Sequence, residues 1–334
     1  MGRNRGNGEK SHIRILVAAA VFLITFAAAV FAMQKWENIT GVFKGESFAE
    51  PTESSEVIRF DGKDYSFKKN TETLLIMGLD KFTGTLSDKS YNNNTQTDFI
   101  MLLVFDNSKK TYTALQFNRD TMIEMPIIGV DGKQIGTTVG QAALAYTYGT
   151  GGKDSCTNTR DAVSSFLMGI KIDKYVSFTM DAVGVVTDKI GGVEVLVTDD
   201  FSEIDDTLVM GKRVVLNSGN ALNFVRSRGG LEDSSNEARM KRQQEYISAL
   251  HNKAAEKRGD KNFVADVLLS VNEYMVSDCS VNKINDYFNK TTEYEFLGIR
   301  QLSGETQIGK NKEFYADGES LLSTVTELFC EPAE

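Results

Sequence analysis

The sequence predicts an α/β domain in which helices cover both faces of a mixed or parallel sheet. Two alternating apolar runs within residues 96–121 are joined by a short polar turn, which is typical of an antiparallel strand pair. Further along, a strand pattern at 175–179, a helix pattern at 181–190 and a strand pattern at 193–197 follow one another, as in right-handed crossover units. The 334 residues allow one large domain or two small ones.

The N-terminal segment predicts a membrane anchor. Residues 15–33 form an uncharged apolar run that is long enough to cross a bilayer as a helix. Four basic residues and one acidic residue precede this run, so we expect residues 1–14 in the cytoplasm and the rest outside. A cleaved signal peptide is the alternative, but its apolar region is usually only about 7–15 residues long. With either interpretation the bulk of the protein is exported, and a retained single-pass anchor places it on the outer side of the cell membrane.

The charge balance and the few histidines and cysteines limit which partners and catalytic groups the protein can use. Acidic side chains outnumber basic ones, and the part of the chain beyond the anchor carries a net charge of −12, which weighs against a nucleic-acid partner. Two histidines, His12 and His251, are too few for a histidine-based triad or zinc site. The cysteines Cys156, Cys279 and Cys330 are too widely spaced for a metal motif, although two of them could form a disulfide. We therefore expect carboxylates, arginines and a hard metal ion to perform any catalysis.

The folded domain is expected to cover residues 71–334, after a polar stalk or linker at 34–70 that contains at most an edge strand at 65–67. A strand at 74–77 then leads through a glycine into Asp80. This places a carboxylate at the C-terminal end of a strand, where ligands bind in open α/β sheets.

The remaining elements follow from periodicity and from glycine or proline punctuation. Loops are expected at 81–96 and around Pro126, after the strand pair. Besides those named above, helices are predicted at 142–148, 157–168, 218–224, 234–250, within 261–290 and at 319–328, and a strand at 294–301. If the segment after the helix at 218–224 is extended, Arg226 and Arg228 point to the same side.

Asp98 and Arg119 carry the first functional prediction. Asp98 begins the first strand of the pair and Arg119 follows the second, so both lie at the same end. A carboxylate beside a guanidinium at a sheet edge suits a metal–phosphate site. A structural salt bridge is the alternative interpretation.

Arginines form a second cluster in the sequence. Four of them lie between positions 226 and 242, and Arg119 makes a fifth candidate. The set is Arg119, Arg226, Arg228, Arg239 and Arg242. Guanidiniums bind phosphate oxygens bidentately and keep their charge, so the cluster predicts a multiply charged anion such as pyrophosphate. A solvated basic helix face is the alternative.

These motifs together resemble the LytR-CpsA-Psr (LCP) family of cell-envelope proteins. The resemblance covers about residues 70–255, with a matching membrane anchor upstream. The segments that carry it are 76–80, 97–101, 118–121, 145–149, 191–193, 221–228 and 239–244.

The resemblance implies a three-layer α/β/α fold with a central mixed sheet and a hydrophobic pocket for a polyprenyl chain. It implies a membrane-anchored phosphotransferase that moves an anionic glycan, of teichoic acid or capsule type, from an undecaprenyl-pyrophosphate carrier to peptidoglycan with Mg²⁺. By matching motif, Asp80 and Asp98 would bind the metal, and the five arginines with Gln243 would hold the pyrophosphate. Asp98 and Arg119 would be catalytic, with Asp98 a candidate acceptor for the hydroxyl proton, while Asp120 is expected to orient Arg119.

The sequence departs from the family pattern at three positions. Gln96 and Phe82 stand where the family often has a basic residue, and Asn236 stands where it often has an acidic one. The first two changes reduce the positive charge at the mouth of the site and leave acceptor choice open. Two other functions remain as alternatives: a polyprenyl-pyrophosphate phosphohydrolase and a non-catalytic, lipid-binding envelope regulator.

Overall fold

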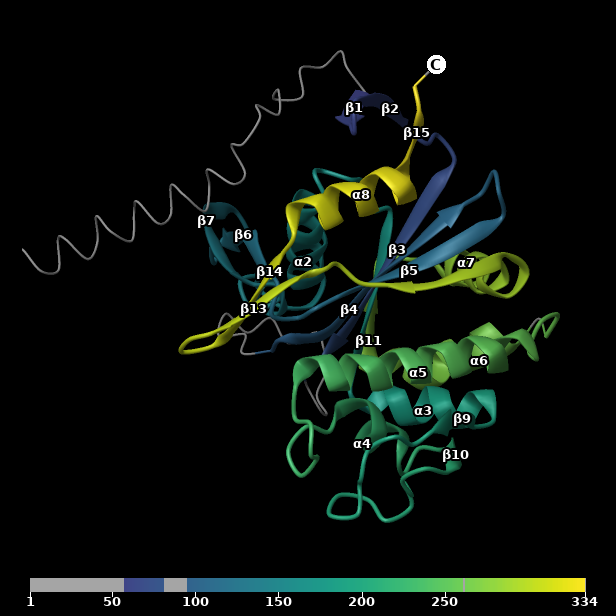
Figure 1. The fold of residues 1–334 in the computed structure, drawn as a ribbon. Helices are drawn as coiled ribbons and strands as arrows, with labels where there is room; N and C mark the ends of the chain where they lie inside the picture. The colour runs from purple at the N-terminus through teal and green to yellow at the C-terminus, as the bar shows by residue number, and fades with distance from the viewer. Residues whose placement is uncertain (1–56, 81–94, 261, 334) are drawn as a thin grey trace, which may run out of the picture. The chain divides into compact units, whose positions relative to one another are not determined.

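The computed structural model describes residues 57–80, 95–260 and 262–333, and a mixed six-stranded sheet forms the centre of this part (Figure 1). Across the sheet the strands are β11 (Met275–Ser277), β8 (Lys174–Thr179), β3 (Thr71–Leu79), β4 (Thr97–Asp106), β5 (Thr111–Phe117) and β12 (Glu295–Arg300). β3 runs parallel to β8 and β5 parallel to β12, whereas the other neighbours are antiparallel. The predicted mixed sheet and the antiparallel β4–β5 pair are therefore confirmed.

Helices cover both faces of this sheet. Successive side chains of a strand point to opposite sides, so the sheet has apolar side chains to bury on each face. On one face, Leu75, Met77 and their neighbours pack against helices from two parts of the chain. These helices are α2 (Gly152–Phe166) and α8 (Gly318–Phe329). On the other face, Leu74 and Phe105 belong to a cluster that reaches α5 (Asn236–Ala255) and α7 (Val281–Glu293). Strands β3, β4 and β5 are buried on both sides, which explains their nearly continuous apolar runs.

A second apolar cluster lies on the far side of α5. It is built from α3 (Asp181–Ile190), β9 (Val193–Leu196), β10 (Arg213–Leu216) and α4 (Ala221–Arg226), with Phe201, Phe224 and Tyr246 inside. β9 pairs with β10 and lies outside the central sheet, so the expected crossover from β8 into a neighbouring strand is wrong. Burial gives the reason, since Val193 and Val195 are buried but the alternate residues are exposed. One covered face and one open face suit a two-stranded ribbon that packs on this cluster with a single side.

Three small sheets surround the core. They are β1 (Val57–Phe60), β2 (Lys63–Phe67) and β15 (Cys330–Pro332); β6 (Met122–Ile128) and β7 (Gln134–Gln141); and β13 (Gly304–Ile308) and β14 (Lys312–Ala316). Strands thus already occur within 57–70, where a linker was expected, and the strand at 65–67 is central in its sheet. The loop expected around Pro126 is strand β6, whose two-stranded ribbon tolerates a proline because its outer edge needs no hydrogen bonds.

Most helix boundaries agree with the prediction. α3, α5 and α8 begin and end within a few residues of the expected positions, and α3 ends at Gly191 with φ of 93°. α2 begins at Gly152, earlier than expected, and residues 142–148 contain only the short 3₁₀ helix η1 (Ala142–Leu144). The region 261–290 is interrupted, with α6 (Phe263–Val271), η2 (Asn272–Tyr274) and then β11 before α7.

Several predictions concern residues that the structure does not describe. The anchor at 15–33, the stalk as far as residue 56 and the loop at 81–94 lie outside the described ranges. Among the helices that are described, none has the length and apolar character to span a bilayer. The three cysteines are described and unpaired, so the disulfide considered above is not formed.

Candidate functional site

A β-bulge positions Asp98. In the β3–β4 pair, Gly78 lies opposite Phe99 and the next pair is Leu79 with Thr97, so Asp98 has no partner on β3. An added Cβ on Gly78 would lie 2.9 Å from the Cβ of Phe99, so only glycine fits this close approach. Bulges change the direction of a side chain and occur next to functional sites. The bulge thus presents the Asp98 carboxylate at the end of the sheet where β5 leads into Arg119.

Asp98 binds two guanidiniums at once. Its Oδ1 accepts from Nη1 of Arg119, as the hairpin pattern predicted, and its Oδ2 accepts from Nη1 of Arg239 at 2.9 Å. Arg119 also donates through Nη2 to Gln96 Oε1, and its Nε lies 3.6 Å from Asp120 Oδ1. The Asp120 contact agrees with the expectation that this residue orients Arg119.

The second carboxylate, Asp80, lies in the same cavity. It follows β3 directly, and its backbone amide donates to the carbonyl of Gln96 at 2.8 Å. Its Oδ1 accepts from Nη2 of Arg226 at 3.4 Å, and both side chains are more than 40% exposed. Arg226 is the last residue of α4, so the extended segment expected for Arg226 to Arg228 is wrong. The helix ends there, and the irregular segment that follows still brings Arg228 to the cavity.

The cavity that these residues share measures about 740 Å³. Its lining residues are Asp80, Gln96, Asp98, Arg119, Asp120, Gln141, Arg226, Ser227, Arg228, Gly229, Arg239, Asn311 and Lys312. Four arginines and one lysine face three aspartates, so the lining carries a net charge of +2 while the whole chain carries −9. A local positive cavity in an acidic protein selects an anionic ligand.

The pKa shifts and unpaired donors inside the cavity also favour an anionic ligand. Burial lowers the pKa of the Arg239 guanidinium; Asp98 opposes this shift, while Arg228 and Arg119 add to it. Burial likewise raises the pKa of the Asp120 carboxyl, against the influence of the same arginines. The buried Nε atoms of Arg119 and Arg239 make no hydrogen bond within the described residues. Crowded guanidiniums, two of them with a spare Nε donor, form an arrangement that a bound anion would stabilise.

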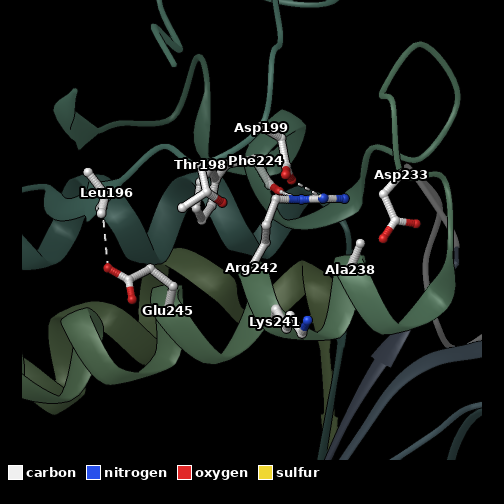
Figure 2. Close-up of a pocket in the computed structure, with 9 residues that line it drawn as sticks. All are labelled: Leu196, Thr198, Asp199, Phe224, Asp233, Ala238, Lys241, Arg242 and Glu245. Carbon is white, nitrogen blue, oxygen red and sulfur yellow. Dashed lines mark hydrogen bonds and ion pairs between the residues drawn. The ribbon is translucent and has the colours of Figure 1, made fainter. Parts of the chain in front are cut away.

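Arg242 and Gln243, both expected to bind pyrophosphate, do not line this cavity. Nε of Arg242 donates to the carbonyl of Phe224 at 3.0 Å, Nη2 donates to the carbonyl of Ser227, and Nη1 pairs with Asp199. Figure 2 shows Arg242 directed from α5 towards Asp199, in a separate pocket of about 370 Å³. Arg242 lies roughly 60° around the helix axis from Arg239, and its three contacts direct its side chain to this other pocket.

Gln243 is also buried, and it forms hydrogen bonds within the protein. Its Nε2 donates to the carbonyl of Val225 at 3.3 Å, and its Oε1 accepts from Gln116 at 3.0 Å. Arg242 and Gln243 together therefore fix the end of α4 against α5, which positions Arg226 and Arg228 for the cavity.

The lining residues that sequence reasoning missed include Gln96, as a direct partner of Arg119, and also Gln141, Asn311 and Lys312. Gln141 ends β7, which was expected to be loop, and the other two come from a C-terminal hairpin that was not predicted. No motif or periodicity marks these positions, because their proximity is created by packing between distant segments.

The donor set fits a magnesium ion held partly by its substrate. Asp80 and Asp98 are the predicted metal ligands and line one cavity, while no cluster of three or more His, Cys, Asp or Glu residues with metal-ligand geometry occurs in the part described. Mg²⁺ commonly uses one or two carboxylates and completes its shell with phosphate oxygens and water.

The fold and the cavity define an α/β protein with a positively charged carboxylate–guanidinium cavity at the end of its central sheet. The model of the LytR_cpsA_psr family matches residues 38–329, so the chain belongs to this family. The resemblance stated from the motifs is thereby confirmed.

Curated relatives are similar over most of the chain. The chain is 27% identical over 241 residues to TagV of Bacillus subtilis, named polyisoprenyl-teichoic acid–peptidoglycan teichoic acid transferase. This match covers 71% of the chain and 52% of TagV, so the chain spans about half the length of that relative. A TagU of Enterococcus faecalis with the same type of name is 25% identical over 263 residues, covering 78% of this chain and 77% of TagU.

Solved structures support the fold. The crystal structure of B. subtilis TagV aligns with a TM-score of 0.58 at 22% identity, covering 78% of this chain and 97% of that one. A protein of Streptococcus agalactiae aligns with a TM-score of 0.64 at 18% identity, covering 78% and 86%. At this level of identity the agreement concerns the α/β fold with its mixed central sheet.

Proposed function

We propose that the protein is a membrane-anchored phosphotransferase that moves an anionic glycan from an undecaprenyl-pyrophosphate carrier to peptidoglycan. The proposed glycan is a teichoic acid or a capsule polymer. The names of the TagV and TagU relatives support a teichoic acid donor and a peptidoglycan acceptor. Anchoring by residues 15–33, with the catalytic domain outside the cell, is part of the proposal because the donor is itself a membrane lipid.

One observation carries the proposal: Asp98 pairs with both Arg119 and Arg239 in a cavity that Arg226 and Arg228 also line. Phosphoryl transfer requires mainly charge neutralisation and alignment of the reacting groups. Guanidiniums on several sides of one cavity supply the neutralisation. A structural salt bridge would need only one partner for Asp98 and no cavity.

In the proposed reaction a sugar hydroxyl of peptidoglycan attacks the phosphorus that is bonded to the glycan. A new P–O bond to the acceptor forms, the bond to the bridging oxygen breaks, and polyprenyl monophosphate leaves. Arg119 and Arg239 would exchange Asp98 for phosphate oxygens when the diphosphate binds. The exchange would free Asp98, whose two oxygens are otherwise occupied, to bind the metal or take the hydroxyl proton.

Magnesium is proposed as the cofactor, held by Asp80 and Asp98. It would supply neutralisation of charge on the diphosphate oxygens. The chain's own arginines orient the diphosphate, and Asp120 keeps Arg119 in position through its contact with Nε.

A reconstituted assay tests the proposal. The full-length protein is incubated with lipid-linked glycan, Mg²⁺ and peptidoglycan oligomers. A covalent glycan–peptidoglycan product is expected. Polyprenyl monophosphate without that product would indicate a phosphohydrolase, and lipid binding without turnover would indicate a non-catalytic binding protein.

Variants assign the site in the same assay. Asp98→Ala and Arg119→Ala should each abolish product formation, because Arg119 would contact the reacting phosphates and Asp98 would hold the metal or take the hydroxyl proton. Asp206→Asn, at an exposed position outside the cavity, serves as the control and should leave the rate unchanged. Full activity of either cavity variant would remove the assignment.

A further inference from the structure

We propose that Lys312, in the C-terminal hairpin, binds a phosphate group of the diphosphate substrate. The inference rests on the proposed function and deepens it, because it adds a cation that none of the motifs contains. It also gives a role to the part of the chain after residue 255.

The hairpin β13–β14 is fixed to the site by its backbone. The amide of Phe314 donates to the carbonyl of Asp120 at 2.8 Å, and Phe314 forms a parallel bridge with Thr121. Nε2 of Gln141 donates both to Asp120 Oδ1 at 2.9 Å and to the carbonyl of Lys312 at 2.7 Å. One glutamine therefore fixes Lys312 relative to the aspartate that contacts Arg119.

Charge balance in the cavity points to Lys312 as a ligand-binding group. Asp98 is paired with Arg119 and Arg239, and Asp80 with Arg226. By contrast, no carboxylate of the described chain lies within ion-pair distance of the ammonium of Lys312 or the guanidinium of Arg228. Arg228 interacts with Asp120 only at longer range, where its charge favours the ionised Asp120 carboxylate. These two cations account for the net positive charge of the lining.

The two cations come from different segments. Arg228 follows α4, whereas Lys312 begins β14. A diphosphate substituted at both ends is a dianion at neutral pH, so it matches this charge. A cation on each of two segments can contact each of its two phosphates, and lysine serves as a point charge for phosphate.

Lys312 is half-buried, and the contact that fixes it is made by its backbone carbonyl. Its side chain can therefore be replaced without removing the contact to Gln141. Lys310 provides a matched control, because it lies in the turn of the same hairpin but does not line the cavity.

The test measures binding of inorganic pyrophosphate to the full-length protein by isothermal titration calorimetry, with and without Mg²⁺. Lys312→Met should weaken binding about 10-fold, the effect of losing one charge-assisted contact. Lys312→Arg should retain most of the affinity, and Lys310→Met should bind as the wild type does. Thermal unfolding of each variant checks that the fold is intact.

Unchanged affinity of Lys312→Met would overturn the inference, and so would an equal loss in Lys310→Met, which would indicate only a general surface-charge effect. In both cases the proposed function would stand, because the wild-type protein still binds pyrophosphate. If the wild type bound no pyrophosphate, both the inference and the proposed function would fail.

Discussion

Asp98 balances two guanidiniums, and only about 9% of its side chain is exposed. Burying charged groups is tolerable when opposite charges and hydrogen bonds compensate them. Removal of the carboxylate would leave Arg119 and Arg239 side by side with no counter-charge between them. The same physical situation makes the pair receptive to a phosphate, which could replace the carboxylate.

Asp98→Asn should therefore lower the free energy of unfolding by about 3 kcal/mol, the usual effect of breaking a buried ion pair. Added inorganic pyrophosphate should stabilise this variant more than the wild type, because the anion restores the missing negative charge. Urea unfolding with and without pyrophosphate measures both effects. Equal stabilisation of the two proteins would contradict the idea that phosphate takes the place of the carboxylate.

His251 provides a pH-dependent prediction. Its Nδ1 is 2.7 Å from the hydroxyl of Tyr112, and burial lowers the pKa of its imidazole from the ordinary value of 6.5. A lowered pKa in the folded state means that this histidine favours folding above about pH 6.5 and that its contribution is lost as the pH falls. His251→Gln should remove this part of the stability loss at low pH, since glutamine does not titrate but can still accept a hydrogen bond from Tyr112.

Melting temperatures at pH 5 and pH 8 test this expectation. The decrease between the two should be smaller for His251→Gln than for the wild type. His12→Gln, the other histidine replacement, should behave as the wild type does. Equal decreases in the wild type and His251→Gln would show that the imidazole does not contribute.

At the level of elements, the contact of α4 with α5 determines where the cavity-lining Arg226 and Arg228 lie. Arg242 and Gln243 hold the carbonyls of Phe224, Val225 and Ser227, so the end of α4 is attached to α5 at three points of the backbone. Arg242 thus holds the end of α4 in place, and with it Arg226 and Arg228 at the cavity.

Arg242→Lys should lower stability by about 2 kcal/mol, because one ammonium cannot satisfy three acceptors in a fixed fork. It should also weaken pyrophosphate binding without contacting the ligand. In an Arg226→Ala, Arg228→Ala background, the same substitution should no longer affect binding. Lys241→Ala, its exposed neighbour on α5, is the control. A binding effect that persists in the double-alanine background would show that Arg242 contacts the ligand itself.

The sequence was sufficient for the strand pair, for most helices and for the convergence of Asp80, Asp98, Arg119 and Arg239, since these depend on local periodicity and on the end of the sheet. It was insufficient for the position of Arg242, because an arginine that packs against a neighbouring helix and one that lines a cavity look alike in a helical sequence. The ribbons β6–β7 and β13–β14 were missed because half-exposed two-stranded ribbons have weak alternation. Lys312 could not be found because its place depends on the bridge between Phe314 and Thr121, which lie far apart in the sequence.

For the whole molecule, one cavity collects residues from five parts of the chain: the ends of β3 and β4, the segment after β5, the end of β7, the α4–α5 region and the C-terminal hairpin. The chain as a whole is acidic, so its field does not attract anions in general. Recognition therefore depends on this local assembly, and the proposed function depends on the assembly binding a single diphosphate.

A crystal structure of the protein with a polyprenyl diphosphate tests this claim most directly. We predict density for the diphosphate inside the cavity, with its oxygens within hydrogen-bond distance of Arg119, Arg226, Arg228 and Arg239. Density for the headgroup elsewhere on the protein, with Asp98 still paired to both guanidiniums in a cavity without ligand, would contradict it.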